Sequence, residues 1–414
     1  MAEPHLIRIV DVTNRDGVQT SRLGLAKLEK TIINVLLNEM GVYRSEFGFP
    51  FTAHEQHYLN ANLQLKAKGL LDPIALSGWC TARLKDVEQS FEFVPGLKHI
   101  CISISTSHQM IHGKFEGKVD RKGVIRMMEE AVKACYDHGA EWVGVNAEDA
   151  SRTEMNELIE YAARAKEIGG KSIRYCDTLG YHDPFTVYER CRKLAETVGL
   201  PIELHCHDDL GMAVAVSTAG AVGAVDGGVD AYINTTVNGM GERAGNADLI
   251  STILALRYAS GFAERKLLDP RVKLSKAWAI AKYGAYAFGV PIPINQPGVG
   301  ANAFAHESGI HADGALKDSR NYELYDYEEL GRGEPETVET GRLITVGEYS
   351  GIKGFRNVYG KLKIEFKNEA EATRILELVR YANVHTQKPL TQHELLFVAN
   401  YPDEARQIMT VTPP

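Results

Sequence analysis

The chain has 414 residues, of which 44% are hydrophobic and 24% charged, a composition typical of globular proteins. Its formal net charge of −8 argues against a nucleic-acid or anionic-membrane partner, because such partners are bound by basic faces. No apolar run approaches the length of a membrane span. The six cysteines are widely spread and form no CxxC pair, which indicates reduced thiols in a cytoplasmic protein.

Short β-branched runs alternate with longer runs of helical period from the N-terminus to Ser260. The runs expected as strands are Leu6–Asp11, Tyr43–Glu46, Pro73–Ser77, Lys98–Ser103, Trp142–Val145, Lys171–Cys176, Ile202–His207 and Ala231–Thr236. Among the expected helices are Leu25–Glu39, Lys85–Phe93, Lys122–His138, Glu154–Glu167, Pro184–Thr197, Ala213–Ala224 and Ala247–Ser260, with helix starts at Thr153, Asp183 and Asn246. Eight such units predict an α/β fold, a (β/α)8 TIM barrel. An open doubly wound sheet is the alternative, although no GxGxxG follows the first strand.

The alternation of strand and helix patterns ends after Ser260, and prolines and glycines are concentrated between Gly289 and Gly300. Two helical patterns follow a polar stretch, near Glu369–Tyr381 and Gln392–Ala399. We therefore expect a catalytic barrel over residues 1–265, a linker and lid-like subdomain over 266–350, and a small helical subdomain over 351–414. The mostly helical extension is expected to pack on the barrel mouth or on a partner subunit.

Two histidines at the end of the seventh expected strand indicate a metal site. His205 and His207 are two residues apart, so they point to one face of the strand. Asp16, in a polar run after the first strand, is the best carboxylate candidate, because the first strand comes close to the seventh and eighth around a closed barrel. Two histidines and a carboxylate form a recognised divalent-metal set with positions left for a chelating substrate. The alternative is a pair of structural histidines bonded to the backbone.

Four further polar clusters fall where barrel enzymes place reacting groups, or in the extension. They are Asn146–Arg152, Cys176–Tyr181, Gly239–Asn246 and His306–Gly314. Each has a structural alternative: helix-start carboxylates, a turn cap, a tight turn with a surface ion pair, and solvent-facing histidines. Taken singly, none of these clusters decides a function.

Taken together, the motifs resemble the acyl-CoA condensing branch of the DRE-TIM metallolyase superfamily. That branch includes isopropylmalate, homocitrate, citramalate and Re-type citrate synthases. Its first motif, Asp-x-Thr-x-Arg-Asp/Glu-Gly-x-Gln, is matched by Asp11–Gln19. The His-x-His, Gly-x-Gly-Glu-Arg-Ala-Gly-Asn and Ser-Gly-Ile-His motifs follow in the expected order, and the resemblance runs from Ile9 to Gly351.

The resemblance implies a role for each matched residue. Asp16, His205 and His207 would hold a divalent ion such as manganese, cobalt, zinc or magnesium. Arg15 would stabilise the alkoxide that forms from the keto oxygen, while Gln19, Thr178 and Asn146 would contact the 2-oxo acid. Glu148 and His311 would act as acid and base at the methyl group of acetyl-CoA, with His311 supplied across a homodimer interface. Asn238 and Glu242 would shape the loop beside the metal.

The choice of 2-oxo acid rests on finer features. Homocitrate synthases carry an Arg four residues before the catalytic Glu, where this chain has Gly144. The first motif and Ser45–Pro50 are most similar to Re-citrate synthases, so oxaloacetate is the first choice of substrate. The side chains expected as partners for its second carboxylate are Arg44, Arg83, Arg174, Ser103, Ser105 and Asn146. The chain departs from the family pattern at two places. Ser107–Met110 stands where the family usually has Ser-Asp-x-His, and Glu348–Tyr349 stands where it usually has Lys/Arg-His.

Several alternatives stay open at this point. A homocitrate synthase or an isopropylmalate- or citramalate-type synthase would share the reaction class. A carbon–carbon lyase of the same superfamily is disfavoured because no cysteine follows Cys206. A non-catalytic metal-binding scaffold is disfavoured by the presence of Arg15, Glu148 and His311.

Overall fold

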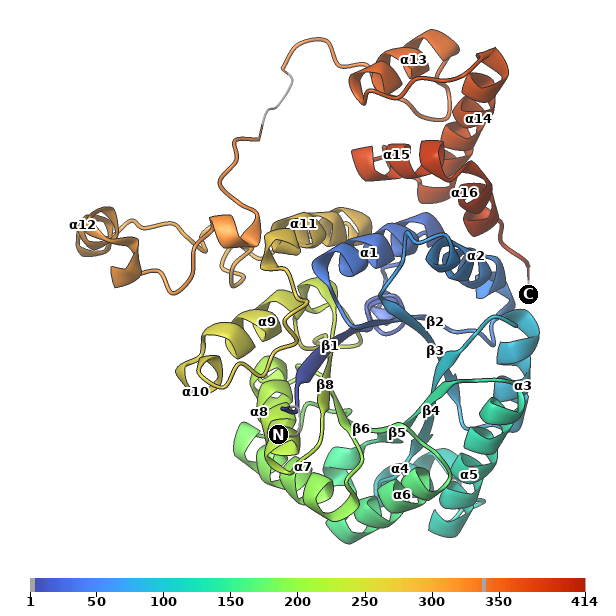
Figure 1. Cartoon of the computed structure of the whole chain (residues 1–414), viewed down its shortest axis with the longest axis vertical. Helices are drawn as coiled ribbons and strands as arrows, with labels where there is room; N and C mark the ends of the chain where they lie inside the picture. The colour runs from blue at the N-terminus through green and yellow to red at the C-terminus, as the bar shows by residue number, and fades with distance from the viewer. Residues whose placement is uncertain (1–3, 337–339, 414) are drawn as a thin grey trace.

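Eight parallel strands close into one barrel in chain order, seen end-on in Figure 1. The structure is a computed structural model that describes residues 4–336 and 340–413. The strands are β1 (Ile7–Asp11), β2 (Arg44–Gly48), β3 (Ala75–Thr81), β4 (His99–Ser105), β5 (Trp142–Glu148), β6 (Ser172–Asp177), β7 (Ile202–Cys206) and β8 (Ala231–Thr235). The predicted TIM barrel is thus confirmed, and the open-sheet alternative is wrong because β1 pairs with β8 as well as with β2.

Helices surround the strands and bury their apolar faces against the outside of the barrel. They are α1 (Lys27–Met40), α2 (Gln56–Ala67), α3 (Leu84–Phe93), α4 (His108–Phe115), α5 (Arg121–Asp137), α6 (Met155–Glu167), α7 (Pro184–Val198), α8 (Ala213–Asp226), α9 (Leu249–Tyr258) and α10 (Ser260–Ala263). Asp183 caps α7 as predicted, because its carboxylate accepts hydrogen bonds from the amides of Phe185 and Thr186. Thr153 does not cap α6, whose N-cap position is Glu154.

Helix α2 is not named among the expected helices, and a buried asparagine, Asn62, interrupts its apolar stripe. The Asn34 amide of α1 donates to Tyr58 Oη at 3.2 Å and to Asn62 Oδ1 at 3.0 Å. Both asparagines are fully buried. Hydrogen bonds rather than apolar contacts alone therefore join α1 to α2, and periodicity of hydrophobic residues does not record such a contact.

The barrel interior holds a chain of alternating charges below its mouth. Arg174 on β6 donates to Glu46 Oε1 on β2 at 2.8 Å and to Glu203 Oε1 on β7 at 2.9 Å, and Arg44 also pairs with Glu203. All four side chains are buried. Burial alone would raise the pKa of Glu203, but Arg174 and Arg44 outweigh it and hold that pKa at about 2. The carboxylates therefore stay ionised.

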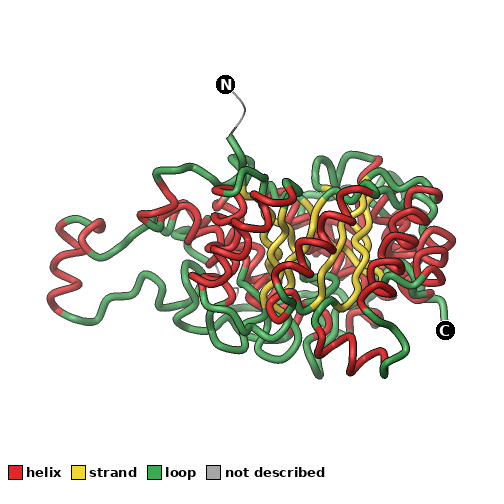
Figure 2. Tube along the Cα trace, turned by 90° about the horizontal axis from the view of Figure 1, so that it is seen from below, coloured by secondary structure: helices red, strands yellow, loops and turns green. Residues whose placement is uncertain are grey.

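The extension begins with α11 (Ala277–Phe288), which lies beside α1. A projecting arm follows and carries α12 (Gly309–Lys317), which reaches away from the barrel in Figures 1 and 2. The last four helices, α13 (Ile352–Lys361), α14 (Glu369–Thr386), α15 (Gln392–Asn400) and α16 (Pro402–Met409), form a bundle. This bundle packs on α1 and α2 at the side of the barrel. The predicted helical extension is confirmed, although neither part of it covers the mouth.

Within the part of the chain that the structure describes, no helix combines the length and the apolar character needed to span a bilayer.

The charge chain predicts a large cost for removing one of its carboxylates. Glu203→Ala leaves Arg44 and Arg174 buried with a missing partner, so the free energy of unfolding should fall by about 3–5 kcal/mol. Glu167→Ala, which removes one half of an exposed pair with Arg164, should cost less than about 1 kcal/mol. Urea unfolding of the two variants measures both values, and similar small losses would contradict the role given to the chain of charges.

Candidate functional site

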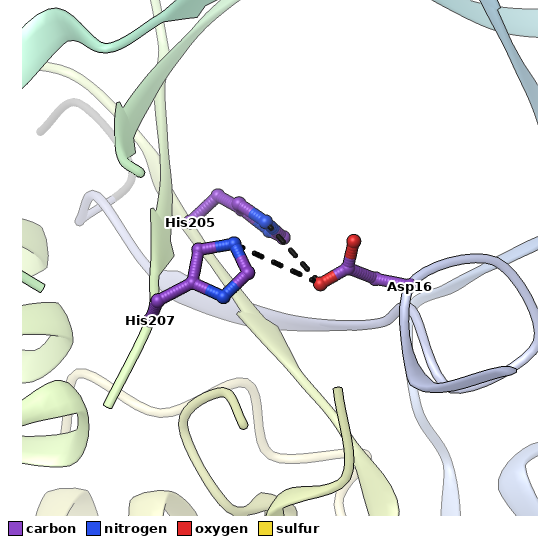
Figure 3. Close-up of side chains that lie close together, drawn as sticks. All are labelled: Asp16, His205 and His207. Carbon is purple, nitrogen blue, oxygen red and sulfur yellow. Dashed lines mark ion pairs between the residues drawn. The ribbon is translucent and has the colours of Figure 1, made fainter. Parts of the chain in front are cut away.

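Asp16, His205 and His207 converge at the carboxyl ends of the strands, as Figure 3 shows. Asp16 lies in the turn after β1, while His205 is in β7 and His207 follows it. The Nε2 atoms of His205 and His207 lie 3.7 Å and 4.0 Å from Asp16 Oδ2. All three side chains are buried. The structure therefore brings together the three residues that the sequence pattern singled out as a metal-binding set.

The loop after β8 folds back along the end of β7 and completes this arrangement. Thr13 Oγ1 accepts a hydrogen bond from the Val237 amide at 2.8 Å, which ties the β1 turn to the β8 loop. His207 and Asn246 form an isolated antiparallel bridge. Gly245 has φ of +94°, and a Cβ there would lie 2.0 Å from the carbonyl oxygen of Gly239. Only glycine permits this close return of the backbone, which carries Asn246 into the site.

The donor set fits a divalent cation. The Asn246 amide donates to Asp16 Oδ2, while Asn246 Oδ1 and His207 Nδ1 are buried without a hydrogen-bond partner among the described residues. Asn234 Nδ2 donates to Glu203 Oε1 at 2.7 Å, so its Oδ1 accepts from His205 Nδ1, 3.1 Å away. His205 Nε2 is thereby left as a lone-pair donor aimed at the site. A histidine oriented by a hydrogen bond of this kind is typical of metal sites.

The protonation states support the same conclusion. Burial lowers the pKa of His205 to about 3 and also lowers the pKa of His207, so both imidazoles are neutral. Burial alone would raise the pKa of Asp16, but Arg15 and the two histidines outweigh it and bring that pKa below its ordinary value. Two neutral imidazoles and one carboxylate are the ligand forms that a divalent metal binds.

Arg15 is positioned beside the three ligands by the charge chain below. Its Nε donates to Glu46 Oε2 at 2.7 Å, and its Nη1 donates to Asp16 Oδ1 at 2.5 Å. The guanidinium also lies over the Trp79 ring, 5.4 Å from the ring centroid. Arg174 in turn pairs with Glu46. Contacts with Glu46, Asp16 and the Trp79 ring therefore fix the Arg15 side chain.

A cavity of about 360 Å³ opens at the carboxyl ends of the strands around these groups. Nine of the eleven residues predicted from the sequence line it: Arg15, Asp16, Gln19, Asn146, Glu148, Thr178, His205, His207 and Glu242. Among the described residues, none after Arg243 contributes to the lining. The cavity of one chain is therefore built by the barrel alone.

Glu148 and Thr178 face the cavity with defined hydrogen bonds. Glu148 accepts from Ser105 and forms an ion pair with Lys114 of α4, whose Nζ lies 2.7 Å and 2.8 Å from the two carboxylate oxygens. Thr178 Oγ1 accepts from the Asp149 amide at 3.0 Å. Because its acceptor role is filled by this amide, the Thr178 hydroxyl proton is free to be donated to a bound carboxylate.

Two predicted residues lie elsewhere. His311, on the projecting arm, is exposed, and its ring stacks on Tyr322 with centroids 4.1 Å apart. His306 of the same arm pairs with Glu323 at 3.1 Å. Asn238 turns away from the cavity, and its amide donates to the carbonyl of Ala281 in α11 at 2.9 Å. Asn238 therefore fastens the β8 loop to α11, and His311 is absent from this chain's own cavity.

Sequence reasoning gave no site role to several residues of this region. Asn246 was predicted as a helix start, but α9 is capped by Asp248, whose carboxylate accepts from the Ser251 amide at 2.7 Å. The only signal for Asn246 was its place at the end of the Gly-Glu-Arg-Ala-Gly-Asn run. For Glu46 and Glu203 the signal is a carboxylate within a run that is expected to form a barrel strand. Lys114 had no signal, because α4 was not foreseen.

Comparison with protein families gives two matches that together span most of the chain. The HMGL-like family model matches residues 6–283. A second model, described as homocitrate synthase post-HMGL domain-like, matches residues 299–386. The boundary between the two matches falls in the passage that leads from α11 into the projecting arm.

Curated relatives cover nearly the whole chain. The chain is 60% identical over 408 residues to a citrate (Re)-synthase of Dehalococcoides mccartyi, with 98% of each chain covered. It is 39% identical to a 2-isopropylmalate synthase of Caldanaerobacter subterraneus, covering 95% of this chain and 94% of the relative. A homocitrate synthase of Nostoc is 33% identical, covering 94% of this chain and 96% of the relative.

Solved structures with low sequence identity share the barrel. The hydroxymethylglutaryl-CoA lyase of Pseudomonas aeruginosa superimposes with a TM-score of 0.57 at 16% identity, covering 70% of this chain and 96% of that one. At this identity the likeness concerns the fold alone.

The geometry predicts which side chains control metal affinity. Asp16→Asn should abolish Mn²⁺ binding, because the charged ligand is lost. Asn234→Ala should weaken it by about 10- to 100-fold, because His205 loses the hydrogen bond that orients it. His112→Ala, on the exposed face of α4, should leave binding unchanged. Isothermal titration with Mn²⁺ measures all three, and wild-type affinity in Asp16→Asn would rule out this site.

Proposed function

The chain belongs to the HMGL-like family, and we propose that it catalyses a Claisen condensation of acetyl-CoA with oxaloacetate, releasing citrate and CoA. The supporting observation is the convergence of Asp16, His205 and His207 beside Arg15 in one cavity, where Asn246 donates a hydrogen bond to Asp16. The relative named citrate (Re)-synthase, 60% identical over nearly the full length, supports the choice of oxaloacetate. The chain would thus be an acyltransferase that converts the acyl group into an alkyl group on transfer.

Binding of the 2-oxo acid uses the metal-binding set, Arg15 and Thr178. A divalent cation held by Asp16, His205 and His207 would polarise the keto carbonyl of the substrate as a Lewis acid. Arg15 places a fixed guanidinium next to these ligands, where the keto oxygen gains negative charge as the carbon–carbon bond forms. Thr178 donates its hydroxyl proton to the neighbouring carboxylate, and Gln19 and Asn146 complete the lining.

Proton transfer at acetyl-CoA is assigned to Glu148 and His311. The methyl group must lose a proton before its carbon attacks the keto carbon of oxaloacetate. Glu148 sits in the cavity between Ser105 and Lys114, in position to orient the thioester or to exchange a proton with it. Water then cleaves the thioester of citryl-CoA, which balances the reaction as citrate plus CoA.

We propose a homodimer in which the projecting arm of one chain reaches the cavity of the other. His311 is exposed in α12, which reaches away from the barrel in Figure 1, and it does not line its own chain's cavity. The same arm exposes the apolar side chains of Ile310, Leu316 and Leu324. Apolar groups in such a position are costly unless another surface covers them. A partner chain would bury them and receive His311 at the same time.

The compartment is proposed to be the cytoplasm. All six cysteines are unpaired and buried. Reduced, buried thiols are typical of proteins in a reducing compartment, where acetyl-CoA is also available.

A CoA-thiol release assay over a panel of 2-oxo acids tests the reaction and the substrate. With Mn²⁺ present, oxaloacetate should give the highest kcat/KM, above 2-oxoglutarate, 2-oxoisovalerate and pyruvate. Chelation should remove activity, and added Mn²⁺ should restore it. His207→Ala should lose turnover while unfolding at nearly the same urea concentration. Preference for another 2-oxo acid would overturn the substrate but not the reaction class, and full activity in chelator would overturn the mechanism.

Subunit complementation tests the position of His311. His311→Ala and Asp16→Asn should each be inactive as homodimers. When the two variants are co-expressed, random pairing makes half of the dimers mixed, and each mixed dimer has one complete site, so activity should recover to about a quarter of wild type. Continued inactivity of the mixture would show that His311 does not act across the interface.

A further inference from the structure

The cavity has a second polar wall opposite the metal-binding set. The ligands come from β1 and β7, whereas β3, β4 and β5 form the far side of the closed barrel. On that side Thr81 is level with Ser103, and Ser103 is level with Asn146. All three line the cavity. A substrate whose keto acid head is held at the ligands therefore points its other end at this wall.

Side chains fill the barrel interior next to Gly144, below the level of Ser103 and Asn146. A Cβ at Gly144 would lie 2.7 Å from the Trp142 ring and 3.1 Å from Cys101 Sγ. The Trp142 ring is itself covered by Arg44, whose guanidinium carbon lies 4.0 Å from the ring centroid. Arg44 is fixed by its pair with Glu203. A long substrate tail therefore cannot extend past Asn146 toward Gly144 in the barrel interior. The partner for a second carboxylate has to lie at the level of Ser103 or closer to the barrel mouth.

Five cationic side chains line the cavity, and four of them already have carboxylate partners. Arg15 pairs with Asp16 and Glu46, and Arg174 pairs with Glu46 and Glu203. The remaining pairs are Lys114 with Glu148 and Arg243 with Asp209. The fifth is Arg83, which follows β3 at the start of α3 and has no carboxylate partner among the described residues.

The polar atoms near Arg83 on this wall are also free to bind a ligand. Ser103 Oγ makes no hydrogen bond to another described residue, and it faces the cavity. Asn146 is only 2% exposed, and its Oδ1 is buried without a partner. Its amide nitrogen donates to no described residue. A hydroxyl, an amide and a guanidinium without internal partners form a set of donors suited to a carboxylate.

We propose that Arg83, with Ser103 and Asn146, binds the distal carboxylate of a four-carbon 2-oxo dicarboxylate and so selects oxaloacetate over monocarboxylic 2-oxo acids. This inference rests on the proposed condensation reaction. It excludes Arg44 and Arg174 from that role, because the carboxylates of Glu203 and Glu46 already pair with both guanidinium groups.

The phosphate groups of CoA are the other anions that Arg83 could bind, and the position of Ser103 and Asn146 favours the carboxylate. Ser103 and Asn146 are on strands inside the barrel, at the level of Arg174 in β6. A bulky nucleotide phosphate remains at the rim, outside the strands, and would not use these two side chains. The two anions can be separated experimentally, because they belong to different substrates with separate KM values.

The test compares Arg83→Ala with wild type for oxaloacetate and for pyruvate, which has the same keto acid head without the second carboxylate. With Arg83→Ala, kcat/KM for oxaloacetate should fall by about 10- to 100-fold, the range for losing a charge-assisted hydrogen bond. The inhibition constant of pyruvate and the KM for acetyl-CoA should change by less than about twofold. Arg83→Lys, which keeps the charge, should recover part of the loss.

Lys85→Ala is the matched control, because Lys85 is an exposed cation two residues along the same helix and does not line the cavity. It should match wild type in every measurement. An unchanged preference for oxaloacetate in Arg83→Ala would overturn the inference, and so would a rise confined to the KM for acetyl-CoA. If wild-type protein releases no CoA with oxaloacetate, the proposed function fails, and the inference fails with it.

Discussion

The site depends on opposite charges buried in a barrel that has little water with which to solvate them. Glu46 and Glu203 keep their negative charges only because Arg174, Arg44 and Arg15 surround them. Two hydrogen-bonded connections run from these carboxylates to the barrel mouth. Glu46 accepts from Arg15, and Glu203 accepts from Asn234, which in turn bonds His205. The core of the barrel thus fixes both the guanidinium of Arg15, which is proposed to contact the substrate, and one of the expected metal ligands. Fold stability and the orientation of the reacting groups rest on the same ion pairs.

The sequence was sufficient to predict the barrel, and most of the site residues predicted from it line the cavity. Strand–helix alternation is a local pattern, and in a closed barrel it forces the residues after each strand to one end. That rule was enough to place Asp16 near His205 and His207. It could not reveal Asn246, because only the backward fold of the β8 loop, made possible by Gly245, brings that residue to β7. The same rule could not place His311, because the projecting arm that carries it follows no strand of the barrel.

The barrel fold by itself does not identify the reaction. A lyase that is 16% identical shares the architecture, whereas synthases with three different names are 33% to 60% identical over nearly the whole chain. The residues proposed to select the substrate, Arg83, Ser103 and Asn146, lie in or directly after β3, β4 and β5. The residue that position 144 can hold, for example, is limited by the Trp142 ring and by the Arg44 guanidinium packed on that ring. Substrate choice is therefore a property of packing as much as of the residue that touches the ligand.

The close fit around Gly144 also limits how such an enzyme can diverge. An arginine introduced there alone would collide with Trp142 and displace Arg44, which would leave Glu203 without one of its partners. Because a buried charge that loses its partner is costly, such a variant would have a lower free energy of unfolding unless Trp142 were replaced as well. Positions 142 and 144 are therefore coupled, and a change at one is best tolerated together with a change at the other.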